Sequence, residues 1–277
     1  MKKIIDTHAY IGRQPLVGMN ITVDKYLALR EFLKQQGFDV RFLLMSGSLE
    51  SNKELSEIVW NDGEAIAGGI LQINPNRNLE AFLGYMPVKD IEALIKKGGI
   101  VGLKNNTAFT KLRIDHEDML PFADLAIAYG LPMIFHCSSS GQDFVSPSYV
   151  RKLLDGRPEL KVVLAHFGGL NESYLPESIR LAKEHQDVYL NTAGLSGEIK
   201  RYDLSSFPPK EPFREHRPEK WEKLFLEAAE DLRGKIVFGS DHPELSFTLH
   251  PVDRLKPEIQ EEILYSTPKK VFRLHDC

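Results

Sequence analysis

Polar residues that bind metals or transfer protons follow several short apolar runs of this sequence. Asp6, His8 and Tyr10 come directly after Ile4 and Ile5, at alternate positions. Side chains of a strand alternate between its two faces, so these three polar groups would share one side. The alternative is an edge strand with a polar face. The pattern indicates a functional site where this strand ends.

The same pattern recurs downstream, where other strand-like apolar runs end in a lysine, a histidine or an aspartate. These run ends carry Lys104, His136, His166 and Asp241. Imidazoles together with a carboxylate are the ligand set of a divalent transition metal, most often zinc. A single histidine at a strand end is more often a hydrogen-bonded structural residue. Three histidines at matching positions favour a metal centre.

Strands and helices must alternate if these run ends are to meet. Apolar runs bounded by turn residues predict eight strands, at 3–10, 40–45, 65–73, 100–104, 132–137, 161–166, 188–191 and 235–238. Amphipathic segments between them predict helices, among them 51–61, 88–97, 117–129 and 176–184. Strand–helix alternation of this kind requires a parallel sheet.

Eight strand–helix units in roughly 250 residues match an α/β fold of the (β/α)8 TIM-barrel type. We expect a single domain over residues 1–277, with the strand ends converging on one face. A doubly wound open sheet is the rival fold. It is less favoured because no glycine-rich phosphate-binding motif follows the first strand. Residues 12–20 are expected to form a loop, and residues 194–216 a long irregular connection.

The composition is that of an ordinary globular protein. The chain has 277 residues, 42% of them hydrophobic and 27% charged, with a net charge of −4. There is no basic stripe, so nucleic acid is not an expected partner. No apolar run approaches the length of a membrane span or a signal peptide. The two cysteines, Cys137 and Cys277, form no metal-binding motif. A cytoplasmic location is the default expectation, and the oligomeric state, a homo-oligomer included, stays open.

A resemblance emerges from the motifs taken in order. They read D-T-H-A-Y from position 6, G-L-K from 102, I-F-H-C from 134, A-H-F-G-G from 165, G-S-D-H-P from 239 and S-T-P-K-K-V-F-R-L from 266. This ordered set, which spans nearly the whole chain, resembles the amidohydrolase-related family. That family contains metal-dependent TIM-barrel hydrolases and decarboxylases of the amidohydrolase superfamily.

The resemblance implies a role for each matching residue. His8, His136 and Asp241 match metal ligands, so one divalent ion is expected, with zinc the leading candidate. Asp241 also matches the residue that handles a proton. His166 matches a histidine that lies beside the metal and contacts substrate. Asp241 and His166 are therefore the predicted catalytic residues.

Tyr10 departs from the family pattern, and the role of Lys104 is open. Tyr10 stands where the family has a second strand-1 histidine, and a neutral phenol is a poor metal ligand because its ordinary pKa is about 10. Tyr10 is predicted to bind substrate or to pack at the barrel mouth. Lys104 matches a lysine that bridges two metals in some relatives. Here it is predicted to bind a substrate carboxylate, and a buried ion pair is the alternative.

Three functions are consistent with the sequence. The leading hypothesis is a metal-dependent hydrolase that cleaves an amide, ester or lactone bond of a small molecule, with or without a carboxylate. In it, Asp241 takes a proton from water and His166 stabilises the oxyanion. A non-oxidative decarboxylase of the same family is the second hypothesis. A non-catalytic, ligand-binding barrel is the third, because of Tyr10.

Overall fold

The fold is seen in a computed structural model of the chain. No helix among the described residues is both long and apolar enough to cross a membrane. The structure describes residues 1–14, 19–61, 64–76, 85–137, 144, 146–169, 174–195, 198–203, 210–216, 219–241 and 247–275.

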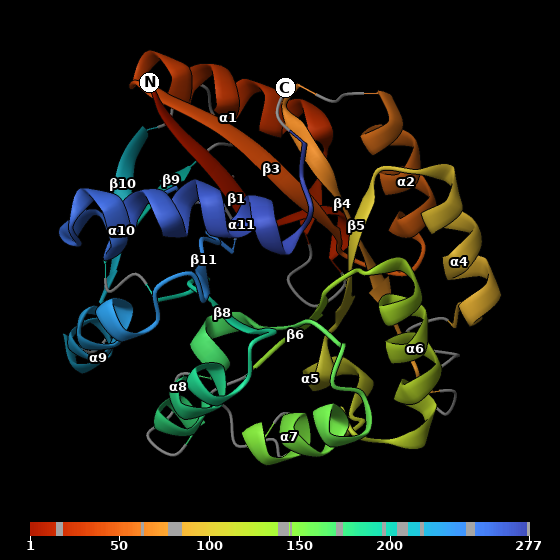
Figure 1. Ribbon diagram of the computed structural model, residues 1–277. Helices are drawn as coiled ribbons and strands as arrows, with labels where there is room; N and C mark the ends of the chain where they lie inside the picture. The colour runs from red at the N-terminus through yellow and green to blue at the C-terminus, as the bar shows by residue number, and fades with distance from the viewer. Residues whose placement is uncertain are drawn as a thin grey trace.

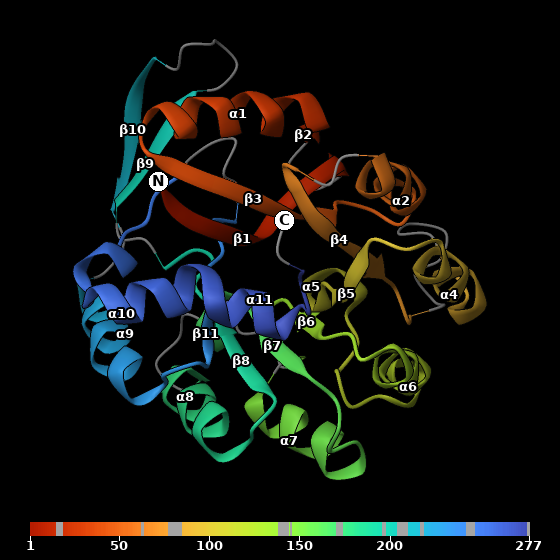
Figure 2. The same cartoon turned by 45° about the horizontal axis from the view of Figure 1, so that its top comes forward.

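Eight parallel strands in the described part of the chain form a barrel (Figures 1 and 2). Each is paired in parallel with the next along the sheet. They confirm the predicted strands and the TIM-barrel fold. In order around the barrel they are β1 (Lys2–Gln14), β3 (Phe38–Ser46), β4 (Ile66–Ile73), β5 (Ile100–Asn105), β6 (Met133–Phe135), β7 (Val162–Leu164), β8 (Val188–Asn191) and β11 (Ile236–Val237).

Helices surround the barrel on its outer side (Figure 2). Their apolar faces cover the strands; Ile91, Leu94 and Ile95, for example, are the buried residues of α4. Between the strands lie α1 (Val23–Gln35), α2 (Ser51–Asn61), α4 (Val88–Lys97), α5 (Thr107–Thr110), α6 (Leu120–Tyr129), α7 (Pro147–Gly156), α8 (Tyr174–Glu184) and α9 (Glu219–Asp231). The chain then forms α10 (Pro257–Glu261), a π-helical turn (Glu262–Ser266) and α11 (Thr267–Val271).

The barrel closes between β1 and residues 236–241, which we call the closing seam. The Thr7 amide donates to the Phe238 carbonyl at 2.9 Å, and Ala9 forms a parallel bridge with Asp241. The first strand is therefore adjacent to the last, as a barrel requires and as an open doubly wound sheet does not allow. The seam also brings the D-T-H-A-Y and G-S-D motifs side by side.

Two predicted connections are wrong. Residues 198–216 contain an antiparallel hairpin, β9 (Glu198–Asp203) and β10 (Lys210–His216), not an irregular segment (Figure 1). The expected loop at 12–20 contains the end of β1 and a short antiparallel strand, β2 (Met19–Ile21). Neither segment has a continuous apolar run. Backbone hydrogen bonds between two antiparallel strands do not require one, so the sequence pattern missed both.

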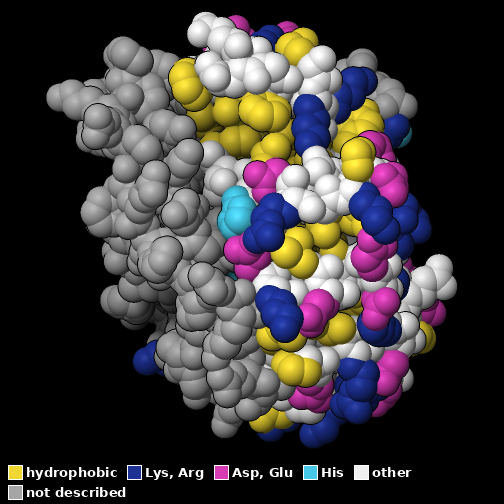
Figure 3. Space-filling model, turned by 90° about the vertical axis from the view of Figure 1, so that its left-hand side faces the viewer, with side chains coloured by type: hydrophobic (Ala, Val, Ile, Leu, Met, Phe, Trp, Pro, Cys, Tyr) yellow, Lys and Arg dark blue, Asp and Glu magenta, His cyan; other side chains and the backbone are white. Residues whose placement is uncertain are grey.

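On the face shown in Figure 3, acidic and basic side chains are interspersed over the coloured part of the surface, and apolar side chains gather near its top. This mixture agrees with the small net charge of −4. Inside the barrel mouth, by contrast, the polar side chains of Asp6, His8 and Lys104 are wholly buried.

Candidate metal and catalytic site

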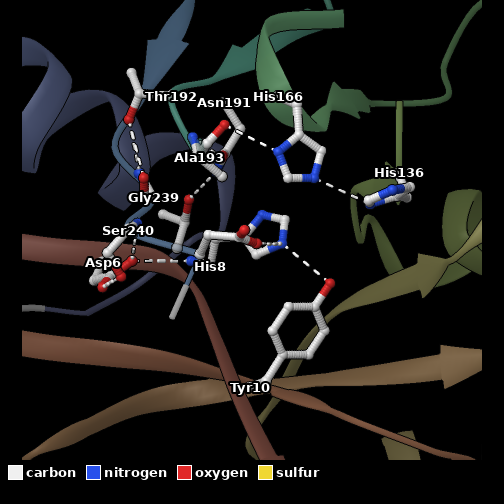
Figure 4. Close-up of polar contacts among 12 residues, drawn as sticks. Asp6, His8, Tyr10, His136, His166, Asn191, Thr192, Ala193, Gly239 and Ser240 are labelled. Carbon is white, nitrogen blue, oxygen red and sulfur yellow. Dashed lines mark hydrogen bonds and ion pairs between the residues drawn. The ribbon is translucent and has the colours of Figure 1, made fainter. Parts of the chain in front are cut away.

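The three histidines selected from the sequence lie together at the carboxyl-terminal mouth of the barrel (Figure 4), and the selected aspartate, Asp241, lies beside His8. His8 Nε2 lies 3.4 Å from Asp241 Oδ1, and the His8 and His166 ring centroids are 5.6 Å apart. His136 and His166 have ring centroids 4.6 Å apart. These residues come from strands far apart in sequence, so only barrel closure brings them together.

His8 lies in an irregular part of β1. The pairing of β1 with β3 changes register between Asp6 and Ala9, so the regular ladder is interrupted at His8. The imidazole is wholly buried, and its Nε2 lies 3.2 Å from the Tyr10 hydroxyl. A bulge of this kind re-aims a side chain next to a functional site. Here it turns His8 toward Asp241.

Asp241 has a strained backbone. Its φ is +77°, in the left-handed region that non-glycine residues rarely adopt. Such a conformation costs on the order of 1–3 kcal/mol and persists only when the surroundings enforce it. His166 and Phe167 are also left-handed, with φ of 53° and 55°. Strain at two of the predicted site residues marks this mouth as a functional centre.

The hydrogen bonds of His166 define its tautomer. Nδ1 lies 3.0 Å from the Ala193 carbonyl oxygen, which can only accept, so Nδ1 carries a proton. In the neutral ring Nε2 is therefore the lone-pair nitrogen, and it lies 3.0 Å from His136 Nδ1. A neutral His166 cannot donate to an oxyanion through Nε2. The predicted oxyanion role would require the protonated ring.

His136 is held in its neutral form. Burial, with smaller effects from the charges of His166 and Lys104, lowers the pKa of His136 well below its ordinary value. A neutral imidazole can ligate a metal. With Nδ1–H donating to His166, Nε2 of His136 is left as its lone-pair nitrogen. Metal-binding histidines commonly have their other ring nitrogen hydrogen-bonded in this way.

Tyr10 and Lys104 provide hydrogen-bond donors in the same mouth. Burial, and then the charge of Asp241, raise the pKa of Tyr10 far above its ordinary value, so its hydroxyl keeps its proton. Lys104 is wholly buried, and its Nζ has no hydrogen-bond partner among the described residues. Burial lowers the pKa of Lys104 to about 8, partly opposed by the charge of Asp241. A buried amine without a partner is costly, and an anionic group bound beside it would offset that cost.

Cys137, next to His136, is an inert thiol. It is buried, its Sγ lies 3.5 Å from the Phe135 carbonyl, and burial raises its pKa to about 12. Because the thiolate is the nucleophile, iodoacetamide should alkylate Cys137 roughly a thousandfold more slowly in the folded protein than in urea. Peptide mass spectrometry measures both rates. Rapid labelling of folded protein would contradict this environment.

Three residues in the described part of the chain offer donor atoms for one metal ion: His8, His166 and Asp241. One ligand atom from each lies within 4.8 Å of the other two. Two imidazole nitrogens and a carboxylate oxygen suit zinc or a similar ion. The predicted set contained His136 in place of His166. His136 is hydrogen-bonded to His166 but is not one of these three residues. Its assignment as a ligand therefore stays a prediction.

The sequence pattern missed the residues that support this cluster. The side chain of Asn191 makes two hydrogen bonds: its Nδ2 donates to Thr7 Oγ1 at 2.7 Å, and its Oδ1 accepts the backbone amide of Ala193 at 2.8 Å. Gly239 packs so closely that an added Cβ would lie 2.5 Å from Asn191 and 2.7 Å from the His8 Cβ. Asn191 could have been found from the sequence, because it is a polar residue at the end of the predicted strand 188–191.

An eight-stranded parallel barrel with imidazoles and a carboxylate at its carboxyl-terminal mouth defines a TIM-barrel enzyme with a candidate metal centre. Residues 80–274, more than half of the chain, match the model of the amidohydrolase family. The chain therefore belongs to the amidohydrolase family of enzymes. Both the hydrolase and the decarboxylase hypotheses are compatible with this membership.

Several solved structures share the fold. A probable 2-pyrone-4,6-dicarboxylic acid hydrolase from Acinetobacter baumannii, solved with citric acid bound, is 16% identical, with a TM-score of 0.62 over 98% of this chain and 99% of that one. A 5-carboxyvanillate decarboxylase from Sphingomonas paucimobilis is 13% identical, with a TM-score of 0.66 over 99% and 100%. A 2,6-dihydroxybenzoate decarboxylase from Rhizobium is 13% identical, with a TM-score of 0.62 over 99% of both chains. No curated protein matches the sequence.

Proposed function

We propose that this protein is a metal-dependent hydrolase that cleaves an amide, ester or lactone bond of a small carboxylated molecule. The observation that carries the proposal is the cluster of His8, His166 and Asp241 donor atoms within 4.8 Å of one another. The proposed metal is one divalent ion, preferably zinc. His8, Asp241 and one imidazole of the His136–His166 pair would hold it. When bound, such an ion polarises a carbonyl and makes water more acidic.

The protein's own groups would handle the proton and the substrate. The Asp241 side chain is 29% exposed, so its carboxylate can reach a water in the mouth. It would accept that water's proton and deliver it to the leaving group. The hydrogen bond from Nδ1–H of His166 to the Ala193 carbonyl oxygen keeps that imidazole oriented toward the site.

Substrate binding would fall to Lys104 and Tyr10. The Lys104 amine is buried without a partner among the described groups, and an incoming carboxylate would supply one. The Tyr10 hydroxyl stays protonated, so it can donate to the substrate or to the developing oxyanion. This pair supports the choice of a carboxylated substrate. Two fold neighbours, a probable 2-pyrone-4,6-dicarboxylic acid hydrolase and a 2,6-dihydroxybenzoate decarboxylase, support the same class of substrate.

Chelation tests the metal role. Protein treated with a strong chelator should lose at least nine-tenths of its activity, and one equivalent of Zn²⁺ or Co²⁺ should restore it, because the donor set in the mouth fits one ion. Atomic absorption measures the metal content, and a panel of amides, esters and lactones measures activity. A metal-free enzyme that is active and unaffected by chelators would reject the metal role.

Variants show where the metal binds. His8→Ala should abolish tight binding, whereas His116→Ala, in the loop before α6, should bind as the wild type does. Comparing His136→Ala with His166→Ala then identifies the third ligand, since only the true ligand's loss should approach the His8→Ala effect. Equal binding by all four variants would place the metal elsewhere.

Decarboxylation is the second candidate, favoured by the buried Lys104 amine, which suits a carboxylate. In that reaction the substrate's C–CO₂⁻ bond breaks, carbon dioxide leaves, and the carbon keeps the electron pair. Asp241, protonated beforehand from water, would then deliver that proton to the carbon and return to its carboxylate form. Release of carbon dioxide from carboxylated aromatic or enoic acids would identify it. Tight ligand binding without turnover in any assay would instead favour the non-catalytic barrel.

A further inference from the structure

We propose that Asp6 is the positioning residue that holds His8 and Asp241 at metal-binding distance across the closing seam. The inference rests on the proposed metal function. The Asp6 carboxylate binds the backbone beside each of the two ligands (Figure 4).

The contacts of Asp6 reach both sides of the seam. Oδ1 accepts the His8 amide at 3.1 Å and the Ser240 amide at 3.0 Å, and Oδ2 accepts the Ser240 hydroxyl. Ser240 immediately precedes Asp241. One carboxylate therefore anchors the backbone of one proposed ligand and the residue adjoining another.

The regular strand pairing cannot do this alone. The β1–β3 ladder shifts register between Asp6 and Ala9, which is where His8 lies. Across the seam, Asp241 has a left-handed backbone with φ of +77°. Both ligands therefore sit on irregular backbone that needs side-chain support. Asp6 is wholly buried, and burying a carboxylate is costly unless several donors satisfy it. The hydrogen bonds from the His8 amide and from the Ser240 amide and hydroxyl contribute to meeting that need.

Purely structural and positioning roles predict different results. A structural hydrogen bond lost anywhere in the barrel lowers stability. Only a positioning residue changes the geometry of the metal. Asn52 provides the matched control: it is also wholly buried, on α2 outside the barrel, and it exchanges two hydrogen bonds with the backbone of Gln72.

The test is Co²⁺ binding to the full-length, metal-free protein, followed by competition with a chromophoric chelator and by visible absorption. Asp6→Asn should bind Co²⁺ about 10–100-fold more weakly, with shifted absorption bands. The neutral amide lacks the negative charge with which the Asp6 carboxylate holds the His8 amide and the amide and hydroxyl of Ser240. Asn52→Ala should lower the melting temperature and leave the Co²⁺ affinity and spectrum unchanged. Wild-type affinity and spectrum in Asp6→Asn would overturn the inference.

Ser240→Ala is the second variant, in case Asp6→Asn does not fold. It should weaken Co²⁺ binding by a smaller factor, and the double variant should bind no more weakly than Asp6→Asn alone, since both act through one contact. Strictly additive losses would contradict this coupling.

A crystal structure of metal-free Asp6→Asn separates this inference from the proposed function. We expect residues 239–241 to be displaced from His8 by about an ångström or more, and superimposable positions would overturn the positioning role. Should the wild type bind no Co²⁺, the metal function fails, and this structure still decides whether Asp6 positions the two side chains.

Discussion

Asp241→Asn should lower kcat by about 10²–10⁴-fold, the usual contribution of a general acid–base residue. The amide has nearly the same shape as the carboxylate, but it cannot take a proton from water or return one to the leaving group. Asparagine tolerates the left-handed backbone that this position requires, with φ of +77°. The hydrogen bonds between Asp6 and Ser240 do not involve the changed group. The loss should therefore be chemical, not conformational.

The measurement is kcat on the first substrate that the wild type turns over, with thermal unfolding and metal content recorded for the same samples. Asp24→Asn, an exposed acid on α1, is the matched control and should keep full activity. If Asp241→Asn loses its metal, activity at saturating Zn²⁺ separates weaker binding from slower chemistry. Full activity with bound metal would reject the proton role of Asp241.

The sequence predicted the barrel well because parallel strands are buried on both faces and read as apolar runs. Phe42, Leu43, Leu44 and Met45, for instance, are all wholly buried in β3. Ser146 followed by Pro147 is also a sequence pattern typical of a helix start, and α7 begins there, with Ser146 Oγ accepting the Ser148 amide at 3.3 Å. Elements with a buried apolar face are therefore readable from local patterns.

The candidate site was predicted in its residues but not in its detailed contacts. Strand ends converge by topology, so His8, His136, His166 and Asp241 could be selected from sequence alone. The choice between His136 and His166 as a ligand depends on a 3.0 Å contact between their rings and on the Ala193 carbonyl. Such contacts follow from backbone irregularities that no periodic pattern encodes.

Asp6 illustrates the same limit. Strict alternation places its side chain with those of His8 and Tyr10, yet its carboxylate binds Ser240 across the seam. The register shift after Asp6 accounts for part of this difference. The partner lies 234 residues away in sequence, so only the closed barrel reveals it.

Lys104→Met should stabilise the metal-free protein and weaken substrate binding at once. The native amine is buried without a partner among the described residues, and its pKa is lowered from 10.5 to about 8. Keeping it charged at pH 7 therefore costs folding up to about 3 kcal/mol, at roughly 1.4 kcal/mol per pKa unit. Methionine fills similar space without charge, so we expect the free energy of unfolding of Lys104→Met to exceed that of the wild type by about 1–3 kcal/mol at pH 7.

The pH dependence identifies the cause of this gain. Between pH 8 and 10.5 the unfolded chain holds a proton on Lys104 that the folded protein has released. Wild-type stability attributable to this group therefore rises with pH across that window. The advantage of Lys104→Met should be full below pH 8 and should disappear as pH approaches 10.5. Urea unfolding at several pH values measures it, and Lys97→Met, at an exposed site on α4, should change stability by no more than about 0.5 kcal/mol.

The same substitution should lower kcat/KM for a carboxylated substrate by about 10–100-fold, the value of one charge-assisted hydrogen bond. An ester or amide that lacks the carboxylate should lose much less. An amine that destabilises the empty barrel and binds the substrate's charge would explain why a buried lysine is retained, since such a site trades stability for function. Unchanged stability together with unchanged kcat/KM would show that Lys104 has a partner in the folded protein and binds no substrate.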